Sequence, residues 1–314
     1  MEFGLPLEKP TAKTLTDCVD RYLEAKKSAG LGDSAYTKQS GLLKRMDAWF
    51  QSRGILYLKD VTADLLSEWR GKWEFKKYDD GQLSASWKVH WAIVKSFFTH
   101  AHKFGWIPVN IAAMLNGFKT ASKQVQPFSK HQMTAILAAV PKCGWDAVKT
   151  QRIVALVQTM RWSGLAIQDA VCLKRSALDE QGRIRTARTK TKTPIAVLLP
   201  PAVAESLRAL PEDKPGYFFT WMSPQKSQIG SEYRKILLKV FEKAGIKDGH
   251  SHQFRHTFAV ENLVAGMKLE DVSRLLGHRS TAVTEKHYSA WIPERQAKLE
   301  AAVRGAWANM ELPG

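Results

Sequence analysis

Four side chains near the C-terminal end of this 314-residue chain have the types and the spacing for chemistry on a phosphate. His252 and Arg255 are three residues apart, so on a helix they lie on one face. A guanidinium binds a phosphate through two parallel hydrogen bonds, and an imidazole moves protons near neutral pH. His278 follows a glycine in a predicted turn, and the hydroxyl of Tyr288 can act as a covalent nucleophile. Together they predict phosphoryl transfer.

Two further histidines, His250 and His256, lie close to His252 in the sequence. Either of these histidines has the chemistry to replace His252 in the predicted site. Only His252 has the three-residue spacing to Arg255, and we therefore assign it to the site.

The order of the site residues along the chain resembles that of the tyrosine recombinase (phage integrase) family. The family has an HxxR motif, then a Leu-Leu-Gly-His turn, then a tyrosine nine or ten positions later. Here the motifs are His252 with Arg255, residues 275–278, and Tyr288. The resemblance extends over nearly the whole chain and is strongest from about 150 to 292. It implies a mainly α fold with a small β-hairpin, in which an N-terminal helical core-binding domain precedes a C-terminal α+β catalytic domain.

One position departs from the family pattern. Residues 163–170 resemble the first catalytic box, but Ala166 stands where the family has its first catalytic arginine. Alanine has no side-chain donor, and loss of one preorganised donor typically costs about 10²–10³ in rate. Arg161 is a poor substitute, because five residues on a helix correspond to a rotation of about 140°. We expect DNA binding with impaired cleavage, whether Ala166 is an engineered change or a natural one.

The alternating runs 183–190 and 193–200 predict a hairpin. Its Lys190-Thr pair resembles the family's lysine box, which implies that Lys190 is the general acid for the leaving 5′-oxygen. Lys192 is the nearest competitor and a candidate DNA contact. The resemblance also implies that Arg255 and His278 bind the scissile phosphate, that His252 assists as acid or base, and that Tyr288 forms a 3′-phosphotyrosyl bond.

Helical periodicity and breaker residues indicate the domain organisation. We expect a helical domain at 12–117, a linker at 118–128, a second domain at 129–292 and a helical tail at 293–314. The resemblance implies that the first domain is a DNA clamp, that the second is catalytic, and that the tail is exchanged between protomers. The individual helices are expected at about 14–30, 34–50, 61–69, 84–104, 129–140, 145–160, 201–211 and 229–244.

The net charge of +17 predicts a polyanionic partner, most simply nucleic acid. Candidate DNA contacts are basic residues on predicted helices and turns, namely Lys38, Lys44, Lys88, Lys95, Lys192 and Arg279. Three scattered cysteines form neither a disulfide framework nor a metal site. We see no signal peptide and no apolar run of membrane length.

The resemblance implies double-stranded DNA with paired half-sites as the partner and a homotetramer on DNA. It implies no cofactor and no metal, because the phosphotyrosyl bond conserves the energy of the cleaved bond. It places the protein in the cytoplasm, with the nucleoid.

Two other functions stay open. A catalytically inactive DNA-binding regulator agrees with Ala166, and residues 269–288 also have helix-turn-helix spacing. A type IB topoisomerase uses the same chemistry to relax supercoils as a monomer. Binding to paired inverted half-sites favours a recombinase over a topoisomerase, and sequence-tolerant relaxation of supercoils favours the topoisomerase.

Overall fold

The computed structural model describes residues 13–75, 81–120, 126–219, 228–278, 280–288 and 292–308. The chain divides into two compact units, residues 1–123 and 124–314. The division falls inside the segment expected to be a linker. Each unit has its own hydrophobic core.

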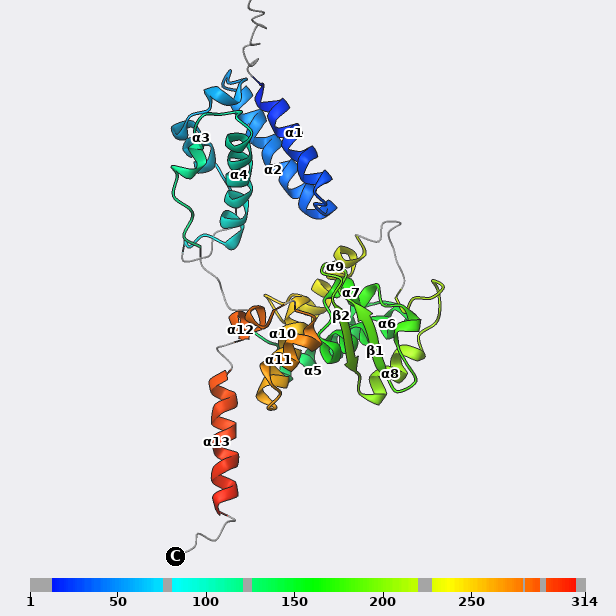
Figure 1. Ribbon diagram of the computed structural model, residues 1–314. Helices are drawn as coiled ribbons and strands as arrows, with labels where there is room; N and C mark the ends of the chain where they lie inside the picture. Colours follow the sequence, from blue (N-terminus) through cyan, green and yellow to red (C-terminus); the bar gives the residue numbers. More distant parts are fainter. Residues whose placement is uncertain are drawn as a thin grey trace, which may run out of the picture. The chain divides into compact units, whose positions relative to one another are not determined.

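The first unit is helical (Figure 1). Its helices are α1 Leu15–Ser28, α2 Asp33–Gln51, α3 Ala63–Gly71 and α4 Ala85–Lys103, with short 3₁₀ turns at Leu58–Asp60 and Ile111–Ala113. Thr14 and Thr62 begin α1 and α3 by accepting backbone N–H groups with their hydroxyls. The four helices agree with the predicted ranges to within a few residues.

Aromatic side chains fill one end of the core of the first unit. The Trp73 ring packs edge-on against Trp69 at 5.1 Å and lies 6.0 Å from Trp87. Phe118 covers Trp73 at 5.7 Å, just before the described part of the unit ends. The apolar residues at helical spacing therefore form this core, as their periodicity predicts.

The second unit contains the remaining elements (Figure 1). Its helices and strands are α5 Lys130–Ala139, α6 Ala147–Ser163, α7 Ile167–Val171, β1 Arg183–Ala187, β2 Pro194–Leu198, α8 Pro201–Arg208, α9 Ile229–Lys243, α10 His252–Val264, α11 Leu269–Leu276, α12 Thr281–Tyr288 and α13 Ile292–Ala308. The 3₁₀ turns are Val140–Cys143 and Arg175–Ala177.

Helix α10 is the centre of this unit. Phe254 and Phe258, one helical turn apart, are both buried and form the side of α10 that faces the core. The backbone N–H of Phe128 donates to Thr257 Oγ at 2.8 Å, which fastens the start of the unit to α10. A capping box between Ser129 and Gln132 then begins α5.

Strands β1 and β2 form a two-stranded antiparallel sheet, with Arg183 opposite Leu198 and Ala187 opposite Pro194. The strands are shorter than predicted, because residues 188–193 form the tip of the hairpin. There the N–H of Arg188 donates to Thr193 O, and the N–H of Lys192 donates to Arg188 O, both at 2.8 Å. Buried Ile184 faces the core, and the period of a strand places Arg188 on the same side.

The junction between α6 and α7 is a tight turn at Gly164. The Ser163 hydroxyl donates to Thr159 O at 2.6 Å and accepts the Leu165 N–H at 3.2 Å. Gly164 has φ +63°, a left-handed conformation that ends α6. Ala166 then occupies the cap position before α7.

No helix among the described residues is long and apolar enough to cross a membrane. In α13, residues Leu299, Val303 and Trp307 are exposed and recur every four positions. They lie along one side of the helix and form an apolar stripe.

Replacing Gly164 with alanine tests how tightly the turn is packed. A Cβ there would lie 2.6 Å from Phe258 Cδ1, in addition to the strain of positive φ. Gly144 is a matched control, because it has φ +72° and nothing within 4 Å of the added carbon. We expect Gly144→Ala to lower the unfolding free energy by about 1 kcal/mol and Gly164→Ala by roughly 1–3 kcal/mol more. Urea unfolding measures both, and equal losses would contradict the packing argument.

Candidate active site

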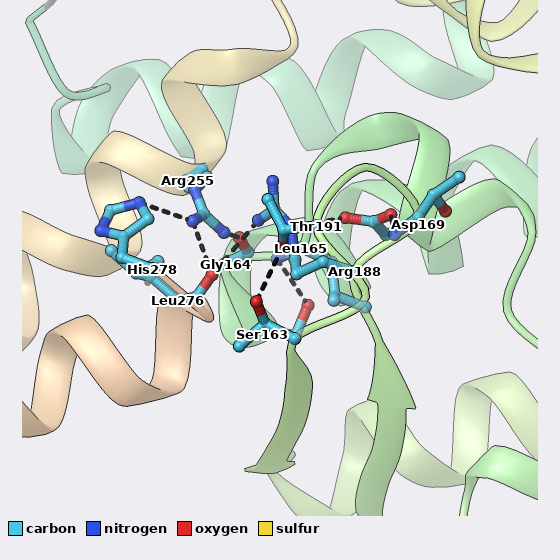
Figure 2. Close-up of polar contacts among 11 residues, drawn as sticks. Ser163, Gly164, Leu165, Asp169, Arg188, Thr191, Arg255, Leu276 and His278 are labelled. Carbon is cyan, nitrogen blue, oxygen red and sulfur yellow. Dashed lines mark hydrogen bonds and ion pairs between the residues drawn. The ribbon is translucent and has the colours of Figure 1, made fainter. Parts of the chain in front are cut away.

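Arg255 is the centre of the site (Figure 2). It is 2% exposed, and its guanidinium donates to Gly164 O at 2.8 Å and to Leu276 O at 2.6 Å. A third contact joins it to His278 Nε2 at 2.8 Å. Burial and the nearby charge of Arg188 lower the pKa of Arg255 to about 9, so it stays cationic at neutral pH.

The contacts of His278 define its protonation. A guanidinium has only donors, so Nε2 of His278 must accept from Arg255. The ring proton is therefore on Nδ1, which lies 2.7 Å from the Thr284 hydroxyl. Burial and the charge of Arg255 lower the pKa of His278 to about 4, which agrees with a neutral ring. In the free protein Nε2 of His278 is an acceptor, and donation to phosphate from this nitrogen requires a proton on it, in the other tautomer or in the imidazolium.

Tyr288 ends α12 and is 2% exposed. Its hydroxyl lies 2.9 Å from His256 Nδ1. Burial raises the pKa of Tyr288 to about 12, and burial lowers the pKa of His256 to about 3. Both side chains are thus neutral, and in the tautomer with the ring proton on Nε2 the phenol donates its hydrogen to His256 Nδ1. This pair brings a proton acceptor to the predicted nucleophile.

The sequence left His256 open as an alternative to His252, and in the structure His256 has a contact of its own, with Tyr288. The rings of His252 and His256 lie edge to face with centroids 4.7 Å apart. The assignment of His252 to the role of acid or base stays a prediction. His252 is exposed at the rim of the site, while His256 is 6% exposed and contacts Tyr288. The spacing of four residues, one turn of α10, is the signal that both rings belong to one site.

The hairpin tip brings basic side chains to the same region of the unit. Lys190 and Lys192 are both exposed, and Lys192 has φ +58°. No hydrogen bond or ion pair of Lys190 exists within the described ranges. Its assignment as general acid stays a prediction, and so does the contact of Lys192 with DNA.

Arg188 is a residue of the site that the sequence did not reveal. Its side chain is 15% exposed and forms an ion pair with Asp169, Nε to Oδ2 at 3.0 Å. It also donates to Leu276 O at 3.2 Å, the carbonyl that Arg255 uses. Burial of the ring is the main cause of the lowered pKa of His252 and of His278, and the charge of Arg188 contributes to both shifts. The sequence did contain one signal for Arg188: the alternation of a strand puts it on the same side as Ile184, which faces the core.

Ala166 lies beside these groups with a half-buried side chain that has no polar atom. Arg161 does not replace it. Its guanidinium forms an ion pair with Glu261 and lies over the Trp162 ring at 4.7 Å. The prediction that Arg161 is a poor substitute agrees with these contacts.

The predicted DNA-binding lysines of the first unit lie on two helices. Lys38 and Lys44 are exposed on α2, and Lys88 is exposed on α4. Lys95 is half-buried, with its ammonium 5.9 Å from the Trp91 ring centre. Arg279 lies outside the described residues. Over the described ranges, no cluster of three or more histidine, cysteine or acidic side chains is arranged to hold a metal ion.

The buried His256 predicts a pH-dependent stability. Its pKa of about 3 is below the ordinary value of 6.5, so the unfolded chain binds a proton first as the pH falls. The contribution of neutral His256 to the free energy of unfolding is complete above pH 6.5 and is lost as the pH falls towards 3. At pH 5 the loss from this group is about 2 kcal/mol. We expect His256→Gln to lose less stability than the native chain between pH 7 and pH 5, measured by urea unfolding. An equal loss would show that His256 is protonated in the folded state.

The sequence profile of the phage integrase family matches residues 126–294. The tyrosine recombinase XerD of Rhizobium meliloti is 27% identical over 293 residues, 86% of this chain and 91% of that protein. The tyrosine recombinase XerC of Chlamydia muridarum is 29% identical over 202 residues, 61% of this chain. The match covers 62% of that protein, less than two thirds of its length.

Among solved structures, a lambda integrase tetramer bound to a Holliday junction superposes with a TM-score of 0.68. The match is 17% identical and covers 91% of this chain and 79% of that chain, so it establishes the fold. The small hairpin within a mainly helical second unit agrees with this fold. With the family profile matched over more than half of the sequence, the chain belongs to the phage integrase family, the tyrosine recombinases.

Proposed function

We propose that this protein is a site-specific DNA recombinase that cuts and rejoins strands through a 3′-phosphotyrosyl intermediate. The observation that supports this most is the pairing of the Tyr288 hydroxyl with His256, in the same cluster as the buried cation Arg255. A nucleophile, a proton acceptor and a phosphate-binding guanidinium are the groups that this reaction needs.

The proposed first step is attack of the Tyr288 oxygen on the scissile phosphorus. The phenolic proton passes to His256 Nδ1 as the oxygen–phosphorus bond forms, because the negative charge then moves onto the phosphoryl oxygens. The bond to the 5′-oxygen breaks, and Lys190 protonates that oxygen. Attack by the 5′-hydroxyl of a second strand reverses the step and releases Tyr288.

Arg255 stabilises the charge on the phosphoryl oxygens in this proposal. A guanidinium has five N–H donors, and contacts in the described part of the chain engage three of those of Arg255. Two N–H groups are left for a phosphate. At 2% exposure, both Arg255 and Tyr288 must gain access to DNA by local rearrangement of the site.

The DNA partner is proposed from the charge of +17 and from the family. We propose a target with paired half-sites, held by the two domains predicted as 12–117 and 129–292 and joined by the linker 118–128. Lys38, Lys44 and Lys88 contact phosphates in this arrangement. The reaction takes place in the bacterial cytoplasm.

We also propose that the protein acts as a tetramer on DNA and that the tail is exchanged between protomers. The exposed stripe of α13, Leu299 with Val303 and Trp307, supports this, because exposed apolar side chains at one-turn spacing favour a protein partner. A cavity of about 870 Å³ between β2 and α11, lined in part by Ile195, Met267 and Leu275, is a suitable acceptor surface.

A regulator without catalytic activity is the second candidate, and Ala166 is the observation that favours it. The two candidates differ in one product, the covalent protein–DNA adduct. A recombinase forms it, and a regulator that only binds DNA does not.

Trapping of this adduct tests the proposed chemistry. The DNA is the sequence that the protein selects from a random duplex pool, prepared as duplexes nicked at successive positions so that the 5′-hydroxyl fragment is lost. We expect a covalent adduct in the Ala166→Arg variant and none in the double variant Ala166→Arg, Tyr288→Phe. The adduct is measured on a denaturing gel. Sequence-specific binding with no adduct in either variant would favour the regulator.

The tail proposal is tested by assembly on the same DNA. We expect Trp307→Glu to reduce tetramers on paired half-sites at least tenfold, measured by sedimentation, because a carboxylate is costly in an apolar contact. Ala301→Glu is the control, since Ala301 is also exposed on α13 but lies on the opposite side from the stripe. Equal effects of the two substitutions would argue against a contact through the stripe.

A further inference from the structure

Two guanidinium groups meet at one carbonyl oxygen in the second unit. Arg255 donates to Leu276 O at 2.6 Å and Arg188 donates to it at 3.2 Å, so the two nitrogens are no farther apart than the sum of these distances. The two residues come from different elements, α10 and the hairpin tip. Figure 2 shows both side chains extending toward the turn at Gly164.

The charges around this carbonyl do not cancel. Within the described residues, Asp169 is the only carboxylate that forms an ion pair with either guanidinium. The neighbouring His256 and His278 are neutral, because burial lowers the pKa of each. One positive charge is therefore uncompensated in a largely buried cluster, which favours an anion as the missing partner.

The contacts of Arg188 connect this uncompensated charge with Ala166, the position where the family has its first catalytic arginine. Asp169, 7% exposed, lies three residues after Ala166 and holds the hairpin through the Thr189 N–H at 2.8 Å as well as through Arg188. The same carboxylate thus connects the short helix that follows Ala166 to the residue that brings a second guanidinium. The side chain of Ala166 offers no donor to this region.

We propose that Arg188 binds the scissile phosphate beside Arg255, supplying from the hairpin tip the guanidinium that position 166 lacks. This inference rests on the proposed function. With Arg188 in this role, the loss of cleavage rate expected from Ala166 is small, because the phosphate still meets two guanidinium groups, those of Arg188 and Arg255. Arg188 is then part of the catalytic machinery, and Asp169 positions it.

The other role for Arg188 is structural, as the residue that fastens the hairpin to Asp169. The two roles differ in what restores activity. A phosphate contact is replaced by an arginine introduced at position 166, whereas a fastened hairpin is not. Arg188→Lys separates them further, because lysine keeps the ion pair but not the two parallel donors of a guanidinium.

The experiment measures the rate of adduct formation on the selected nicked duplexes, together with DNA affinity and thermal stability. We expect Arg188→Ala to slow adduct formation by about 10²–10³ with DNA affinity changed less than tenfold. We expect Ala166→Arg to raise the rate of adduct formation at least tenfold in the Arg188→Ala background. In the native chain we expect it to raise this rate less than tenfold. Arg188→Lys should give an intermediate rate.

Arg185→Ala is the matched control, because Arg185 lies on β1, three residues before Arg188, with a side chain that is 66% exposed and near Asp179. Its rate should equal that of the native chain. Three results would overturn the inference: a native rate in Arg188→Ala, no rescue by Ala166→Arg, or a native chain that forms adduct only after Ala166→Arg is introduced. Absence of any Tyr288-dependent adduct in every variant would instead reject the proposed function.

Discussion

The second unit depends on a buried positive charge, that of Arg255, which has no carboxylate ion-pair partner in the described part of the chain. Arg255 is 2% exposed, and burial of a cation is costly unless its donors are bound. Two of its acceptors, Gly164 O and Leu276 O, lie at the C-terminal ends of α6 and α11. The carbonyl end of a helix has partial negative charge, so both ends stabilise the guanidinium.

This arrangement explains why glycines end both helices. Gly164 and Gly277 have φ +63°, and each turn directs a carbonyl toward α10. A Cβ at Gly277 would lie 2.9 Å from Ile195 on β2, so that turn also keeps the hairpin close to the site. The turns, the hairpin and α10 are therefore held together around one charge.

The sequence predicted the elements better than the contacts. The amphipathic helices and the glycine stops could be found because they depend on local periodicity and backbone conformation. The roles of His256 and Arg188 depend on which elements meet in space, α12 with α10 and the hairpin tip with α7. Arg188 is one of several basic residues in its run, and only the position of Asp169 distinguishes it from exposed Arg185. The shorter strands have a similar cause, since hydrogen bonds across the tip, from Arg188 to Thr193, replace the ladder there.

The burial of Tyr288 has a consequence for the protein when it is away from its target. A phenol that is 2% exposed and bonded to His256 is kept from phosphates that touch the outer surface. A basic protein samples a great deal of DNA through non-sequence-specific contacts before it reaches a particular site. In the proposed mechanism Tyr288 is the nucleophile, and an exposed nucleophile would risk a strand break at every such encounter. Its burial would then protect the genome during the search and make strand cutting conditional on the rearrangement that exposes Tyr288.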